Sequence, residues 1–149
     1  MAGWLVLCLS VGIIALSFGA LNVPLWYAKL VKPPLTPPNA LFAVVWPILY
    51  ALMAVAAWLV WKTPYSTCRF NGLRLFCLQL LFHLLWAWFL FDRHQISVAF
   101  LDLAVMWITF LVTMLNFRRV NVTAAWLLVP CLVWMTFVGY LNAGFWRLN

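Results

Sequence analysis

The sequence has 149 residues, of which 68% are hydrophobic and 7% are charged. Soluble globular proteins carry about 25% charged residues, so a water-soluble fold could not bury this much apolar surface. The sequence therefore predicts an integral membrane protein. Nine Lys and Arg against two Asp and Glu give a net charge of +7, but these residues are scattered between apolar segments. This pattern is typical of side chains that meet lipid headgroups and argues against nucleic acid as a partner.

Five apolar segments are long enough to cross a bilayer, since a helical span needs about 20 apolar residues. They cover residues 3–21, 41–61, 72–91, 96–117 and 123–146. Backbone polar groups in hydrocarbon must be hydrogen-bonded within the protein, which favours helices over isolated strands. The connections are short, apart from a proline-rich loop at residues 22–40 between the first and second spans. The prediction is an all-α integral membrane protein with a single domain, residues 1–149, in which sequential helices are antiparallel neighbours.

The loop contains the stretch WYAKLVKPPLTPPN, residues 26–39, with four prolines within six residues. Each proline fixes its own φ and pushes the preceding residue toward an extended conformation, so the stretch cannot continue a helix. Its stiffness also lowers the entropy lost when it folds over the end of the bundle. Two interpretations are open at this point: a lid over a cavity, or a spacer between two helices.

Polar and aromatic residues recur at helical spacing in four of the five spans, which indicates faces turned away from lipid. These stripes comprise Trp46, Tyr50 and Met53; Gln79, His83 and Trp86; Asp102, Met106, Thr109 and Thr113; and Pro130, Trp134, Val138 and Asn142. Large flat side chains with few polar groups suit a planar, mostly apolar ligand. An aromatic core without a ligand fits the same spacing.

Two ionisable residues inside the spans allow more than one role. Asp102 is the only acid within a span, where an ionised carboxylate is costly, so it is either proton-linked or a structural acid with a paired or protonated carboxyl. His83 has no second imidazole or thiolate at ligand spacing, so no metal site is predicted; a hydrogen-bonding role in a pocket and axial ligation of haem remain open.

No nucleophile with a base, phosphate loop or carboxylate pair occurs in the sequence, which argues against hydrolysis and phosphoryl transfer. Radical chemistry through tryptophan leaves no such motif and stays open.

Four stretches resemble signature motifs of the translocator protein (TspO/MBR) family, in the same order along nearly the whole chain. They are WYAKLVKPPLTPP in the first loop, VWPILYALM and QLLFHLLW in the second and third spans, and VPCLVWMTFVGYLN in the fifth. The resemblance implies a protein that binds porphyrins such as protoporphyrin IX and haem and acts in their transport, sensing or disposal. It implies no required cofactor, and usually a homodimer. The alternatives are a light- or oxygen-dependent porphyrin-degrading enzyme and a membrane scaffold without ligand turnover.

Animal relatives in this family also bind cholesterol and synthetic benzodiazepine-type or isoquinoline ligands, so these ligand classes are implied as well. A cholesterol-recognition pattern needs a basic residue close after its tyrosine. Arg147 lies one position too far from Tyr140 for that pattern, which argues against a sterol. The placement of the cysteines and the lack of a transit peptide are compatible with a bacterial chain, whose location would be a membrane of the cell envelope.

The resemblance also implies which residues surround the ligand. Carried over by position, they are Trp26, Trp46, Tyr50, His83, Trp86, Trp134, Val138 and Leu141, and Asp102 matches an acid that is frequent in the fourth helix of the family. Four positions depart from the family pattern: Leu35 replaces a loop tryptophan, His83 an asparagine, Cys131 a tyrosine and Val138 an alanine. Leu35 removes one aromatic from the expected lid, and the added bulk of Val138 is expected to narrow the pocket.

Overall fold

Five long helices make up most of this computed structural model, which describes the backbone of residues 1–149 and the side chains of residues 1–20 and 23–149. The helices are α1 (Ala2–Leu25), α2 (Asn39–Trp61), α3 (Thr67–Ala87), α4 (Ile96–Val120) and α5 (Val122–Leu148). A π-helical turn, Trp88–Asp92, extends α3. Among the described residues, five helices are long and apolar enough to cross a membrane. The prediction of an all-α integral membrane protein with five spans is confirmed.

The helices extend beyond the predicted spans where polar side chains cap them. α3 begins at Thr67, five positions before the predicted span, because the Ser66 side chain accepts a hydrogen bond from the backbone N–H of Arg69 at 3.1 Å. In the same way the Asn121 side chain accepts from the N–H of Ala124 at 3.0 Å at the start of α5. Such caps satisfy backbone donors that have no partner within the helix. Helix therefore continues past the hydrocarbon-spanning segments.

The connection between α1 and α2 is shorter than the loop predicted at residues 22–40. α1 continues past Pro24 to Leu25, and a short 3₁₀ turn follows at Tyr27–Lys29. A proline inside a helix removes one backbone hydrogen bond, and membrane helices tolerate this where neighbouring groups or local adjustment satisfy the freed carbonyl. α2 begins at Asn39, immediately after Pro38 in an extended conformation. Residues 26–38 thus form the connection.

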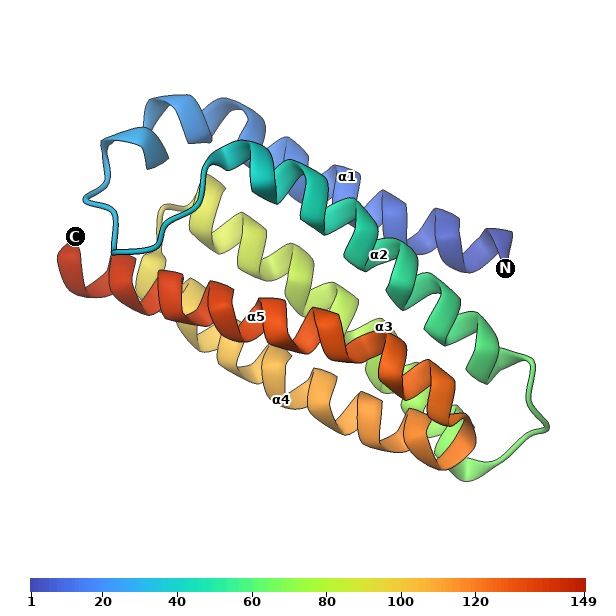
Figure 1. Ribbon diagram of the computed structural model, residues 1–149. Helices are drawn as coiled ribbons and strands as arrows, with labels where there is room; N and C mark the ends of the chain where they lie inside the picture. The colour runs from blue at the N-terminus through green and yellow to red at the C-terminus, as the bar shows by residue number, and fades with distance from the viewer.

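The helices pack side by side in the order α1–α2–α5–α4–α3, α3 packs back against α1, and α2 also touches α3 across the interior. The α1–α2 connection and the C-terminus lie at one end of the bundle, and the N-terminus lies at the other (Figure 1). We call the first of these the loop end. All five helices reach this end, and the start of α4 lies there next to the end of α3.

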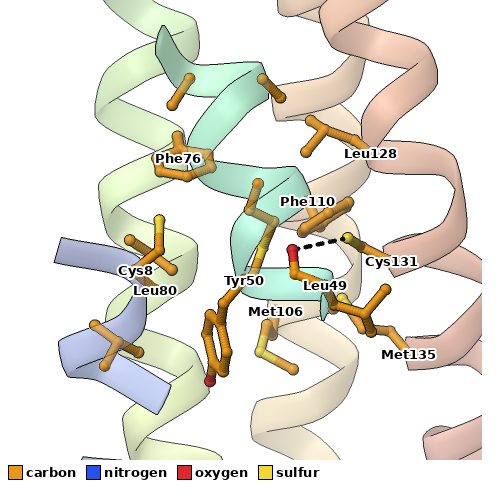
Figure 2. Close-up of a cluster of buried hydrophobic side chains, with 14 of the residues drawn as sticks. Cys8, Leu49, Tyr50, Phe76, Leu80, Met106, Phe110, Leu128, Cys131 and Met135 are labelled. Carbon is orange, nitrogen blue, oxygen red and sulfur yellow. Dashed lines mark hydrogen bonds between the residues drawn. The ribbon is translucent and has the colours of Figure 1, made fainter. Parts of the chain in front are cut away.

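The half of the bundle near the N-terminus is filled by large buried side chains. Those that are completely buried include Met53, Phe76, Met106, Phe110, Phe117 and Leu128. Part of this cluster appears in Figure 2, where the Cys131 thiol donates a hydrogen bond to the Leu49 carbonyl at 3.7 Å and links α5 to α2. Helices in lipid associate mainly through close packing and interhelical hydrogen bonds. This packing makes the N-terminal half a rigid base for the loop end.

The α1–α2 connection is fastened to the C-terminal part of α5. The Asn149 side chain accepts a hydrogen bond from the Val31 N–H at 2.9 Å and donates one to the Val31 carbonyl at 3.0 Å. The Tyr140 hydroxyl donates to the Pro34 carbonyl at 3.1 Å. Because prolines restrict the backbone between these anchors, the connection is held across the end of the bundle.

Gly144 leaves the space into which the connection packs, which gives a first testable prediction. A Cβ at this position would lie 2.6 Å from Pro33 Cβ and 2.8 Å from its Cγ, and a proline ring cannot rotate away. Such overpacking costs about 1–3 kcal/mol, so Gly144→Ala is expected to release the connection and speed tryptic cleavage at the exposed Lys29. Gly139→Ala is the control, since its Cβ would approach Leu103 only to 3.9 Å. Equal cleavage of the two variants would contradict the prediction.

Candidate functional site

A cavity of about 420 Å³ lies at the loop end between α1, α2, the end of α3 and α5. Its volume falls within the range of about 300–1,000 Å³ that is usual for small-molecule sites. Most of the residues implied by the family resemblance line it, namely Trp46, Tyr50, His83, Trp86, Val138 and Leu141. The structure therefore brings together, in one space, side chains from three helices that the sequence could only assign to separate stripes.

Trp46 lies at the centre of the aromatic wall. Its ring centroid is 4.5 Å from that of His83 in an edge-on arrangement, 6.0 Å from Tyr50 and 6.2 Å from Trp86. Tilted and edge-to-face pairs of this kind contribute about 0.5–1.5 kcal/mol each beyond their burial. The three neighbours are buried, whereas Trp46 is only partly buried. The indole of Trp46 therefore keeps surface that can contact a ligand.

Asn142 holds the helices around the cavity in place. Trp86 Nε1 donates a hydrogen bond to Asn142 Oδ1 at 3.1 Å, and Asn142 Nδ2 donates to the carbonyl of Ile96 at 3.0 Å. One amide thus joins α3, α5 and the start of α4 within hydrocarbon, where polar side chains commonly link neighbouring helices. The same residue lines the cavity. The predicted stripe on the fifth span included Asn142, but only the structure shows its two partners.

His83 presents an unpaired nitrogen in the wall of the cavity. Its side chain is 2% exposed, and Nδ1 is buried with no hydrogen-bond partner among the described residues. Buried polar atoms in proteins are almost always paired, so this unpaired Nδ1 distinguishes His83 from the other polar residues of the wall, such as Asn142, whose amide has two partners. In the family pattern this position is an asparagine.

Two implied wall residues lie outside the lining of the described cavity. Trp26 stacks instead on His94, with ring centroids 4.2 Å apart and planes 17° apart. Trp134 packs against Trp46 and Phe42, at centroid distances of 6.4 and 5.5 Å. A step of four residues overshoots one helical turn by about 40°, so residues along such a stripe drift around the helix. Trp134 therefore supports Trp46 from α5 while residues further along α5 reach the cavity.

The first helix supplies part of the wall, and the stripe predicted on the fourth span does not reach the described cavity. Asp102 lies on α4 away from the lining, and its Oδ2 is buried without a partner among the described residues. α4 packs against α3 and α5 in the ring, which places those two helices between α4 and the cavity.

On the first helix, the small residues Gly12, Ala15 and Gly19 line the cavity. Their helical spacing was a signal in the sequence that allows close approach.

Tyr27 closes the loop end of the cavity. It lies between Phe145 and Phe91, at centroid distances of 5.1 and 6.0 Å, and is 6% exposed. Burial raises the pKa of Tyr27 to about 12, so the phenol is neutral at physiological pH. Lys32 Nζ lies 5.7 Å from the centre of the same ring. The lysine side chain therefore lies beside the residue that closes this end of the cavity.

The sequence profile of the TspO/MBR family matches residues 4–147. The tryptophan-rich protein TspO of Chlorobaculum tepidum is 38% identical over 144 residues, which cover 96% of this chain and 91% of the relative. The protein CrtK of Rhodobacter capsulatus is 34% identical over 125 residues, 83% of this chain and 78% of the relative. The translocator protein of Ovis aries is 35% identical over 126 residues, 83% of this chain and 75% of the relative.

Proposed function

Because this chain belongs to the TspO/MBR family, we propose that it binds porphyrin-type tetrapyrroles, such as protoporphyrin IX and haem, in the cavity at the loop end. The observation that carries the proposal is the aromatic wall around this space of about 420 Å³. Trp46 contacts His83, Tyr50 and Trp86 there. A planar macrocycle gains stacking contacts from such a wall and needs few polar partners. We assign the binding to transport, sensing or disposal of the ligand.

The polarity of the cavity favours an amphiphilic ligand in one orientation. Its deep part is lined mainly by aromatic and aliphatic side chains, whereas Asn39 lines it near the α1–α2 connection. Lys32 lies beside Tyr27 at the same end. The carboxylates of a porphyrin would meet a cation there at headgroup level, where basic residues and water compensate negative charge. The macrocycle would then occupy the deep part.

Titration of the protein in lipid nanodiscs with protoporphyrin IX tests this function. We expect tryptophan fluorescence to be quenched saturably at one porphyrin per chain, because several indoles border or adjoin the cavity. Quenching that rises linearly without saturation would contradict the proposal. Excess cholesterol is expected to leave the bound porphyrin in place, since an aliphatic ring system gains less from aromatic faces. Illumination of the complex distinguishes simple binding, which leaves the porphyrin spectrum unchanged, from the degrading enzyme, which yields a product.

A further inference from the structure

The described residues that line the cavity are exposed along one side of it. The exposed ones are Leu16, Ala20 and Pro24 of α1 and Asn39 and Ala43 of α2. All lining residues from α3, its π-helical turn and α5 are buried or partly buried. On each of the two helices the exposed residues follow one another in steps of four, so they form one edge along α1 and one along α2. The cavity therefore opens between α1 and α2.

This opening ends where α1 packs tightly against α2. A Cβ at Gly12 would lie 2.7 Å from the Tyr50 ring, so the two helices are in direct contact at that depth. Nearer the loop end, a Cβ at Gly19 would lie 3.9 Å from the Phe91 ring, so α1 is supported there by the π-helical turn. Between the Gly12–Tyr50 contact and the loop end, space is left between α1 and α2.

In contrast to the opening between α1 and α2, the end of the bundle beneath the α1–α2 connection is closed. Tyr27, Leu141 and Phe145 form a buried cluster there, with exposures of 6%, 3% and 3%. The connection covers this end and is hydrogen-bonded to α5 through Asn149 and Tyr140. A ligand passing this way would have to break those anchors and open the cluster.

We propose that the ligand passes between the cavity and the hydrocarbon of the bilayer through the opening between α1 and α2, which we call the lateral portal. The inference rests on the proposed tetrapyrrole function. The edges of the portal are Leu, Ala and Pro side chains of two apolar helices that are long enough to span a membrane, with Asn39 at the loop end. Such a rim contacts acyl chains without exposing polar groups to them. An apolar macrocycle dissolved in the bilayer thus reaches the aromatic wall without crossing water, with its carboxylates at headgroup level.

Stopped-flow transfer of protoporphyrin IX between lipid vesicles and protein in nanodiscs tests the portal. Ala43→Phe adds a ring at the α2 edge and is expected to slow association and dissociation together, each roughly tenfold, because both cross the same raised barrier. Because Ala43 also lines the cavity, the direction of the dissociation rate is the deciding readout. A blocked portal slows dissociation together with association, whereas a lost ligand contact speeds dissociation, and faster dissociation in Ala43→Phe would overturn the portal. Val44→Phe is the matched control: Val44 is the next residue, is 60% exposed and lies outside the lining. It is expected to leave both rates at the wild-type values.

A second variant separates the portal from a route through the connection. Asn149→Ala combined with Tyr140→Phe removes the hydrogen bonds that anchor the connection. The portal predicts wild-type rates for this double variant. Faster transfer in the double variant, or equal rates for Ala43→Phe and Val44→Phe while binding stays saturable, would overturn the portal alone. Absence of saturable quenching in the wild-type protein would overturn the proposed function and the portal with it.

Discussion

Replacing Trp46 by alanine is expected to weaken protoporphyrin IX binding by about 10- to 100-fold, at 1.4 kcal/mol per tenfold. The partly buried indole is the part of the wall with surface left for a ligand. Its removal takes away stacking worth about 0.5–1.5 kcal/mol and apolar burial worth about 25 cal/mol per Å². It also removes the ring that positions His83 and Trp86. Absorbance titration at the Soret band measures the change without relying on the missing fluorophore.

Trp134→Phe is the control for Trp46→Ala, because Trp134 packs behind Trp46 rather than along the cavity. Phenylalanine keeps an aromatic ring in the contact with Phe42. The Trp134 Nε1 atom is buried without a partner among the described residues, so losing this donor removes no hydrogen bond. The affinity of Trp134→Phe is expected to stay within about threefold of wild type. Equal losses in both variants would show that Trp46 has no special role in the wall.

The spans were predictable from sequence because the thickness of the bilayer sets a minimum length for an apolar helix. Each predicted span lies inside a helix of the structure, counting α3 together with its π-helical turn. The ends were less predictable, since capping residues such as Ser66 lie outside the apolar run. The first span was predicted to end at residue 21, yet α1 continues through Pro24 to Leu25. Hydrophobicity thus determines where a helix must exist but not where it stops.

The candidate site was predictable only as far as single helices allow. Helical spacing identified Trp46 with Tyr50, and His83 with Trp86, as pairs that share a face. It could not show which neighbouring helix each face meets, and that is decided by the ring order of the bundle. For this reason α1 lines the cavity although no stripe was predicted on it, and Asp102 does not.

The cover of the cavity also depends on geometry that the motif does not carry. Leu35, which stands where the family has a tryptophan, is 78% exposed and has a φ of 65°. A leucine at positive φ is uncommon and marks a tight turn between the paired prolines. Tyr27 rather than Trp26 reaches the cavity, because Trp26 stacks on His94 of the α3–α4 connection. The aromatic cover is thus provided by Tyr27, the second of the two adjacent aromatic residues in the motif, and not by Trp26.

His83→Asn is expected to separate haem from metal-free porphyrin. Imidazole nitrogen is a common protein ligand of haem iron, and the His83 ring is part of the cavity wall. The variant is expected to lose haem affinity by about tenfold or more, whereas protoporphyrin IX, which has no metal, stays within about threefold. Asparagine is the family residue at this position, so the variant is expected to keep the packing around Trp46.

The Soret band of bound ferric haem provides the measurement, because its position depends on the axial ligand. Wild-type protein is expected to shift the band on binding, and both His83→Asn and His83→Ala are expected to lose that shift. His83→Ala distinguishes ligation by the imidazole from a ligand contact that an asparagine amide can replace. Identical Soret maxima in all three proteins would show that the iron is not bound to His83. The haem would then be held by stacking on Trp46 and its aromatic neighbours, as metal-free porphyrin would be.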